Sequence, residues 1–264
     1  TGVGMGWLVT KYDAFGRVVY TGWMSETTIT STKRYEKQNT LNNFIGPVFE
    51  TKTTSSGTID GISVNYTNDA YPKTNVKILT ISYYDNYVYP NAPTVPVSVE
   101  SQDVMTNVKG MPTGSWVRVL TDVNQTHGEL SYTFYDQKSR PILSHTKNHL
   151  GGYTETLVHY NFDGTTQYSI TNHRLNTNSP VVTYHETFEY SPQGRLVTHK
   201  HYIPGQEEVL LTHHTYDNLG QLISKDVGGA QSMQTGLQKV NYVYNIRGWL
   251  THINELNHLE SNPG

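Results

Sequence analysis

A short phrase recurs along the chain: a tyrosine, then Asp, Asn or Ser, then two variable residues and a glycine. Clear copies begin at Tyr12, Tyr190, Tyr216 and Tyr244, and weaker copies begin at Tyr160 and Tyr135, the last with Ser139 in place of the glycine. From Tyr135 onward the phrases follow one another at intervals of 25 to 30 residues. Repetition at this period is typical of an array of small units, each stacked on its neighbours.

The phrase has the composition of a β-hairpin turn. The tyrosine ends one strand, and the Asp, Asn or Ser after it offers a side-chain oxygen to the backbone N–H groups of the turn. The glycine supplies the positive φ that a type I turn with a bulge requires, and the residues after it restart an antiparallel strand. Ser139 is expected to fit this position less comfortably, because a Cβ is strained at positive φ.

The segments between the phrases resemble strands. Residues 196–202 and 238–244 are rich in β-branched and aromatic side chains and are bounded by turn residues. Tyrosine occurs 20 times against 6 phenylalanines, which favours half-buried sheet surfaces because a tyrosine packs its ring while its hydroxyl stays in water. The sequence therefore predicts an all-β fold made of antiparallel hairpins.

The first half of the chain is less regular. Residues 1–130 hold one clear phrase, and residues 131–264 form the regular array; we expect them to be one continuous unit excised from a longer chain. Further strands are expected at 78–83 and 115–120, a loop or an extended edge at 89–96, and a loop or short helix within 31–50. Residues 83–87 echo the phrase but lack its glycine.

Charge and composition exclude several classes of binding partner and site. The net charge is −3 without a long run of one sign, so neither nucleic acid nor an anionic membrane is an expected partner. No apolar run reaches the length of a membrane span. Cysteine is absent, which excludes disulfides and thiolate metal sites.

The phrase, followed by Gly-Arg-Leu or its variants, resembles the YD repeat of RHS (rearrangement hotspot) proteins. The matching text lies at residues 12–19, 110–116, 190–195 and 244–250, and the Arg-Gly-Trp-Leu of the last copy is fairly specific. This variant is similar to the long RHS-repeat proteins of Bacteroidetes, which are related to the YD shells of Tc toxins and teneurins. The resemblance covers most of the chain.

The resemblance implies a spiral of antiparallel hairpins around a hollow shell, which in many members encloses a C-terminal toxin. The implied partners are other segments of the same long chain and that cargo. The family's self-cleaving segment, with its Arg-Tyr-Tyr-Asp-Pro text, is not found here, so neither protease nor toxin activity carries over. The implied structural residues are Tyr12, Asp13, Gly16, Arg17, Tyr135, Asp136, Tyr160, Gly164, Tyr190, Gly194, Arg195, Tyr216, Asp217, Gly220, Tyr244, Asn245 and Gly248.

Histidines offer one alternative. His199 and His201 alternate along a predicted strand and would share a face, and His213 is adjacent to His214 further along the chain. Two imidazoles on one face bind zinc if a third ligand comes near, for which Glu186, Glu189 and Asp217 are candidates. No His-Glu-x-x-His motif occurs, and imidazoles on a polar sheet face are the commoner arrangement.

Aromatic side chains offer a second alternative. Tyr242 and Tyr244 would lie on one strand face, with Trp249 nearby, and such a surface could stack on sugar rings, including those of cell-surface glycans. We nevertheless expect a non-enzymatic shell segment of a large secreted or surface-exposed bacterial protein, without a cofactor. A carbohydrate-binding or adhesive module is the alternative, followed by a zinc-dependent enzyme or a glycosidase.

Overall fold

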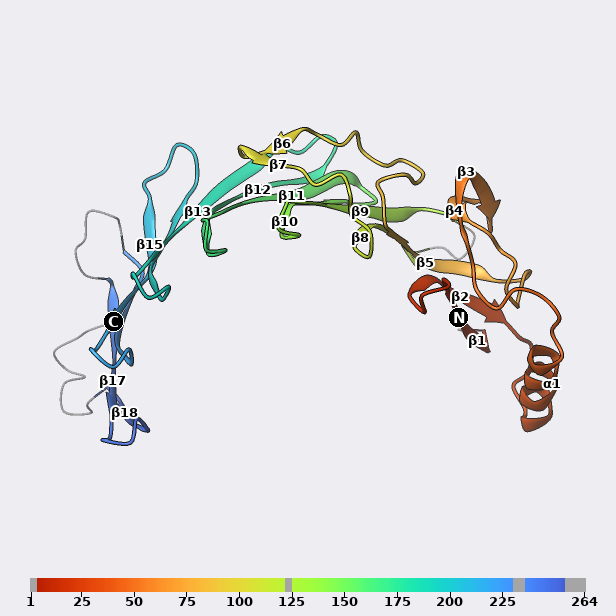
Figure 1. Ribbon diagram of the computed structural model, residues 1–264, viewed down its shortest axis with the longest axis horizontal. Coiled ribbons are helices and arrows are strands. Elements are labelled where there is room, and N and C mark those ends of the chain that lie inside the picture. The colour runs from red at the N-terminus through yellow and green to blue at the C-terminus, as the bar shows by residue number, and fades with distance from the viewer. Residues whose placement is uncertain (1–3, 122–124, 230–235, 255–264) are drawn as a thin grey trace. The chain divides into compact units, whose positions relative to one another are not determined.

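The structure, a computed structural model, describes residues 4–121, 125–229 and 236–254 (Figure 1). Its elements in chain order are β1 (Gly6–Tyr12), β2 (Val18–Ser25), α1 (Ser31–Asn42), β3 (Lys52–Ile59), β4 (Ile62–Tyr66), β5 (Lys77–Tyr84), β6 (Ser98–Val99), β7 (Gln102–Asp103), β8 (Pro112–Arg118), β9 (Gly128–Tyr135), β10 (Pro141–Lys147), β11 (Gly151–Tyr160), β12 (Thr166–Asn176), β13 (Val182–Tyr190), β14 (Leu196–Tyr202), β15 (Val209–Tyr216), β16 (Leu222–Val227), β17 (Gln238–Tyr244) and β18 (Leu250–Ile253).

One large antiparallel sheet holds most of these strands. Its 14 strands follow the order β1-β2-β5-β8-β9-β10-β11-β12-β13-β14-β15-β16-β17-β18, and β3–β4 and β6–β7 form separate two-stranded ribbons. The prediction of an all-β fold is therefore confirmed. Among the described residues, helix is confined to α1, and no helix is long and apolar enough to cross a membrane.

Packing divides the chain into two compact units. Unit 1 comprises residues 1–154 with 175–179, and unit 2 comprises residues 155–174 with 180–264. The boundary at residue 130, which was drawn from the regularity of the repeats, stays a prediction.

Unit 1 builds its core from two insertions between neighbouring strands of the sheet. Residues 26–76 carry α1 and the β3–β4 hairpin, and residues 85–111 carry the β6–β7 ribbon (Figure 1). Tyr66 of β4 and Tyr89 of the second insertion stack on either side of Tyr83 of β5, with ring centroids 5.7 and 4.6 Å away. Both insertions thus cover the same sheet face and remove its aromatic side chains from water.

A buried ion pair fastens the first insertion to the sheet. Lys11 Nζ lies 2.8 Å from Glu50 Oε1, and both residues are almost fully buried. Lys11 also donates to the Asn68 side chain and the Ala70 carbonyl, and Glu50 accepts from the N–H of Ala70. Because the charges are hydrogen-bonded on both sides, the desolvation penalty of burying them is offset.

Helix α1 forms for local reasons. Thr30 caps it, its Oγ1 accepting a hydrogen bond from the Lys33 N–H at 3.1 Å. None of its residues is buried, so the helix contributes nothing to the core. The sequence allowed a loop or a short helix within residues 31–50. The structure has a helix over residues 31–42 and irregular backbone over residues 43–49.

Unit 2 is a plain array of hairpins. Strands β13–β14, β15–β16 and β17–β18 pair as successive hairpins, and each pair contains a register shift next to its phrase tyrosine. Among the described residues of this unit, the buried side chains are all small and hydroxylated: Ser169, Thr171, Thr198 and Ser224. Large apolar side chains here remain half-buried or exposed.

Candidate functional site

The phrase turns share one backbone geometry. In the first copy, the Asp13 N–H donates to the Arg17 carbonyl at 2.9 Å and the Gly16 N–H donates to the Asp13 carbonyl at 3.0 Å. The corresponding two hydrogen bonds close the other five copies. Asp13 Oδ1 also accepts from the Phe15 and Arg17 N–H groups, each at 2.9 Å, as Asp136, Asp217 and Asn245 do in their own turns.

The last residue of each turn has a positive φ. The five glycines at this position have φ between 74° and 96°, namely Gly16, Gly164, Gly194, Gly220 and Gly248. Ser139 adopts the same conformation with φ of 64°, although it carries a Cβ. The copy that lacks glycine thus keeps the turn at a cost in backbone strain.

The phrase tyrosines tie each hairpin to the one before it. The Tyr216 hydroxyl donates to the Leu196 carbonyl at 2.8 Å, and the Tyr244 hydroxyl donates to the Leu222 carbonyl at 3.0 Å. Each acceptor lies six positions after the tyrosine of the preceding phrase, where the new strand begins. From the sequence these tyrosines were predicted only to end strands; the hydrogen bond was not predicted, because its acceptor is a backbone atom 20 or more residues away.

Unit 1 contains the same tyrosine bond. The Tyr84 hydroxyl donates to the Val18 carbonyl at 3.1 Å, and the Tyr135 hydroxyl donates to the Pro112 carbonyl at 2.6 Å. Val18 lies six positions after Tyr12, as the pattern of unit 2 requires. Pro112, in contrast, has no uninterrupted copy of the phrase directly before it in the sequence.

Residues 84–112 are a phrase opened by an insertion. The Asp85 N–H donates to the Met111 carbonyl at 3.1 Å, and the Gly110 N–H donates to Asp85 Oδ1 at 2.7 Å. Gly110 has φ of 83°, and Tyr84 pairs with Pro112 beside a register shift. The glycine that residues 83–87 lack is therefore Gly110, brought back to the turn after the insertion.

An arginine links the first phrase to this opened one. Arg17 donates two hydrogen bonds to the Asp85 carboxylate, at 2.9 and 2.6 Å, and another to Asp13 at 2.7 Å. Its guanidinium also lies 4.4 Å from the centre of the Tyr84 ring. The Arg17 hydrogen bonds, helped by the Gly110 N–H, lower the pKa of Asp85 and keep it ionised.

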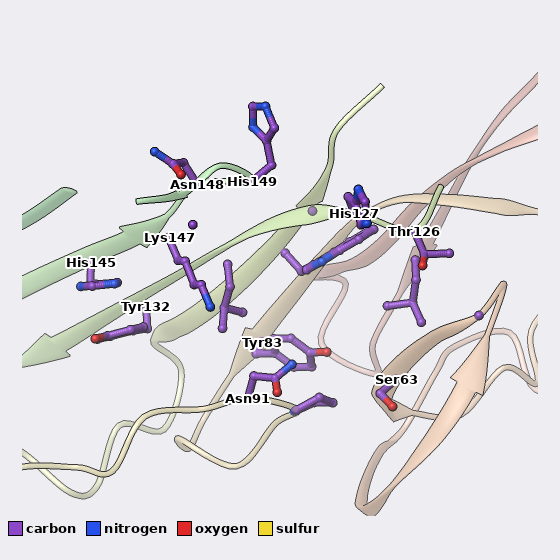
Figure 2. A pocket seen from close by; sticks show the side chains of 17 residues that line it. Ser63, Tyr83, Asn91, Thr126, His127, Tyr132, His145, Lys147, Asn148 and His149 are labelled. Carbon is purple, nitrogen blue, oxygen red and sulfur yellow. The ribbon is translucent and has the colours of Figure 1, made fainter. Parts of the chain in front are cut away.

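A pocket lies on the aromatic face of unit 1 (Figure 2). Its volume is about 680 Å³, within the usual range for pockets that hold small ligands. Seventeen residues line it: Gly61, Ile62, Ser63, Tyr83, Pro90, Asn91, Trp116, Thr126, His127, Gly128, Leu130, Tyr132, His145, Lys147, Asn148, His149 and Gly151. This site was not predicted from the sequence, because strands β8, β9 and β10 and both insertions contribute residues to it.

The side chains that line the pocket are partly committed to the structure. His145 stacks on Tyr132 of the neighbouring strand with centroids 4.7 Å apart, and His149 Nδ1 lies 3.2 Å from Glu129 Oε1. Asn148 Oδ1 accepts from the Gly152 N–H at 2.8 Å. Lys147 is exposed and forms no ion pair with a carboxylate of the described chain.

The histidines suggested for zinc do not assemble a site. His199 Nε2 lies 3.0 Å from Glu186 Oε1, and His213 Nδ1 lies 3.8 Å from Asp226 Oδ2. The His201 ring packs on Tyr184 with centroids 5.4 Å apart. No group of three or more His, Cys, Asp or Glu side chains in the described ranges is placed to hold a metal ion.

The other suggested zinc ligands have partners of their own. Glu189 lies 3.6 Å from Lys200 Nζ, and Asp217 accepts the turn N–H groups of its phrase. The three-ligand arrangement that the zinc hypothesis requires is therefore not formed by the candidate residues.

The aromatic residues suggested for sugar stacking are divided between two roles. Tyr242 and Tyr244 are half-buried on β17, and the Tyr244 hydroxyl is used in the bond to Leu222. Trp249 is 64% exposed, and the Arg247 guanidinium lies 5.6 Å from the centre of its ring. Trp249 alone of the three thus presents most of its ring to solvent.

Comparison with known proteins gives a distant likeness. No protein-family model matches the sequence, and no curated protein is similar to it. A solved structure of TcdB2-TccC3-Cdc42 is similar over 96% of this chain, with 12% sequence identity and a TM-score of 0.29. This chain spans 13% of the length of that chain. The likeness to this Tc-toxin complex is too distant to carry an argument about function.

Proposed function

We propose that this chain is a wall segment of an RHS/YD-repeat shell in a large secreted or surface-exposed bacterial protein. In this role the sheet encloses a cargo, such as a C-terminal toxin, or presents a surface to other cells. Its partners are neighbouring segments of the same long chain and the enclosed cargo. The role is mechanical and requires no catalytic residue and no cofactor.

The hairpin-to-hairpin tyrosine bonds carry this proposal. A ladder of strand hydrogen bonds alone allows one hairpin to twist against the next. The Tyr216 and Tyr244 hydroxyls add a fixed point at each hairpin junction, at the carbonyls of Leu196 and Leu222. The same device recurs at Tyr84 and Tyr135 in unit 1. A repeated side-chain tie between successive hairpins is the kind of feature that a continuous wall needs.

The open edges of the sheet also support the proposal of a shell segment. Among the described strands, β1 pairs only with β2 and β18 only with β17, so each leaves one edge open. An open edge presents unpaired backbone groups to any other strand. In the proposed shell, neighbouring segments of the same polypeptide pair with these two edges.

Cryo-electron microscopy of the natural full-length polypeptide tests the proposal. We expect the strands of neighbouring segments to continue the sheet beyond β1 and β18 around an internal volume that holds another part of the chain. A segment that stands free, with both edges open and nothing enclosed, would overturn the proposal.

A protection assay tests the tyrosine bonds in the same polypeptide. The Tyr216→Phe/Tyr244→Phe double variant removes two hydroxyls and keeps both rings, and we expect a protease to reach the enclosed region several-fold faster than in the wild type. Tyr242→Phe is the matched control, because its hydroxyl forms no hydrogen bond within the described chain. Equal cleavage of all three proteins would count against the role of the ties.

A further inference from the structure

The pocket of unit 1 has a floor made by the sheet itself. Trp116, Leu130 and Tyr132 come from the neighbouring strands β8 and β9, and their side chains line the same cavity. The indole of Trp116 packs against Gly128, where only a glycine leaves room for it, because a Cβ at Gly128 would lie 2.1 Å from Trp116 Cε2. The floor therefore combines an indole, a phenol ring and an aliphatic side chain on one sheet face.

The rim of the pocket is polar and comes from four separate segments. Ser63 belongs to β4, Asn91 to the second insertion, and Thr126 with His127 to the segment before β9. Figure 2 shows Lys147 extending from the end of β10 toward Tyr83, into the space above the floor. Hydroxyl, amide, imidazole and ammonium groups thus converge on a partly apolar floor.

The electrostatics of the pocket favour a ligand with a negative charge. Its lining includes a lysine and three histidines, and no aspartate or glutamate. The carboxylate of Glu129, which contacts the pocket residue His149, lies 3.2 Å from His149 Nδ1. An ammonium group without a carboxylate partner is available to an anion that enters.

The number of charges distinguishes between classes of anion. Phosphate groups are generally held by several backbone N–H groups, an arginine fork or a helix N-terminus. The lining of this pocket contains no arginine and no helix, and Lys147 is its single permanently charged group. One point charge suits a carboxylate, and the many hydroxyl and amide groups of the rim suit a ligand rich in hydroxyls.

We propose that this pocket binds an acidic saccharide, a sugar with a carboxylate on its ring. Lys147 pairs with the carboxylate, the C–H face of the sugar ring packs on Trp116, and Ser63, Asn91 and Thr126 hydrogen-bond its hydroxyls. The inference goes beyond the proposed wall and does not depend on it, because every residue that it uses belongs to unit 1. It also differs from the surface at Tyr242, Tyr244 and Trp249 that the sequence suggested.

Titration calorimetry with a matched pair of probes tests the proposal. Trigalacturonic acid carries the carboxylates, and its fully methyl-esterified form keeps the sugar rings without the charge. We expect the acid to bind at least about tenfold more tightly than the ester, because a hydrogen bond to a charged group contributes about that much or more. Equal affinity for both probes, or binding of neither, would overturn the proposal.

Variants locate the binding in the pocket. Lys147→Met is expected to weaken binding of the acid about tenfold to a hundredfold and to leave binding of the ester unchanged. Lys239→Met removes the same charge from an exposed position on β17 and is expected to change neither. Because Lys147 is exposed, its replacement leaves the fold intact. Binding of the acid that survives Lys147→Met unchanged would refute the assignment.

A third variant tests the floor. Trp116→Leu removes the indole and is expected to weaken binding of both probes by a similar factor, since stacking does not depend on the carboxylate. Near-ultraviolet circular dichroism of the tyrosine-rich core shows whether the variant has folded. A folded Trp116→Leu protein with wild-type affinity would also refute the assignment.

Discussion

Units 1 and 2 use the same hairpin turn and the same tyrosine tie but bury different side chains. In unit 1, two insertions cover one face of the sheet, and tyrosines such as Tyr20 and Tyr83 are 2% exposed. In the described part of unit 2 the buried side chains are those of two serines and two threonines, and large apolar side chains are half-buried or exposed. The repeat therefore specifies strand pairing, and the buried aromatic core and the pocket of unit 1 lie where two insertions interrupt the repeat.

The largest expected difference between the units is in aromatic burial. Tyr83→Ala removes a ring stacked between Tyr66 and Tyr89 and should lower the free energy of unfolding by about 3–5 kcal/mol. Tyr184→Ala, at a half-buried position on β13, should cost about 1–2 kcal/mol. Urea unfolding of both variants measures the difference, and equal losses would mean that the insertions add little.

Breaking an ion pair should also destabilise unit 1 more than unit 2. Lys11→Met leaves Glu50 charged and buried in unit 1, and we expect a loss of about 3–5 kcal/mol. Lys200→Met breaks pairs of 3.6 and 3.8 Å with Glu189 and Glu208 on the open sheet of unit 2, and should cost about 0–1 kcal/mol. Thermal unfolding of the two single variants measures both losses of stability. A Lys11→Met/Glu50→Gln double variant should regain part of the loss, and no regain would place the effect elsewhere.

The turn position itself should behave alike in both units. Ser139→Gly in unit 1 relieves a positive φ of 64° and should stabilise the protein by about 1 kcal/mol. Gly194→Ser in unit 2 is the reciprocal change at φ of 74°, where no atom within 4 Å would meet the new Cβ, and should destabilise by a similar amount. Denaturant midpoints provide the measurement. The same sign in both variants would contradict the strain argument.

The smallest expected effect is the acid sensitivity that Asp85 gives to unit 1. Hydrogen bonds from Arg17 lower the pKa of Asp85 in the folded protein. The resulting stability is present above the ordinary aspartate pKa of about 3.9 and is lost as the pH falls through the lower, folded pKa. Asp85→Asn should therefore lose less stability than the wild type between pH 5 and 2. Parallel acid titrations of the two proteins would contradict this.

Asp136 should add to the acid sensitivity of the same unit. Burial alone would raise the pKa of Asp136, but hydrogen bonds from the Arg140 side chain and from the backbone N–H groups of Arg140 and Lys138 outweigh it and lower the pKa. Its contribution to stability has the same sign as that of Asp85. Hydrogen exchange should accordingly show that the protection of these two turns falls as the pH is lowered through the folded pKa values of Asp85 and Asp136.

The turns and strands could be predicted from the sequence because their causes are local. The residue types at Asp13 and Gly16 are those that a bulged type I turn needs, and the runs 196–202 and 238–244 coincide with β14 and β17. Of the run predicted at 115–120, residues 119 and 120 lie beyond the end of β8. Local pattern sets the type of element more firmly than its last residue.

The pocket, the tyrosine ties and the opened phrase could not be predicted, because each joins residues that are far apart in the chain. Gly110 returns to the turn of Asp85 across 25 positions, and the Tyr216 hydroxyl meets a carbonyl 20 positions away. No spacing rule marks such partners in a single sequence. The place of Trp116 in the pocket floor could not be predicted either, since the position of Gly128 beside its indole is set by strand register.

The opened phrase at Asp85 and Gly110 also shows where this architecture tolerates added length. The Asp85 N–H still donates to the Met111 carbonyl although 24 residues separate Asp85 from Gly110, the Gly110 N–H donates to Asp85 Oδ1 in place of the Asp85 carbonyl, and the Tyr135 bond to Pro112 is kept. The two middle positions of any phrase, such as Asn218 and Leu219, are therefore natural grafting points. A foreign loop or a small domain introduced there would leave the sheet beneath it in register.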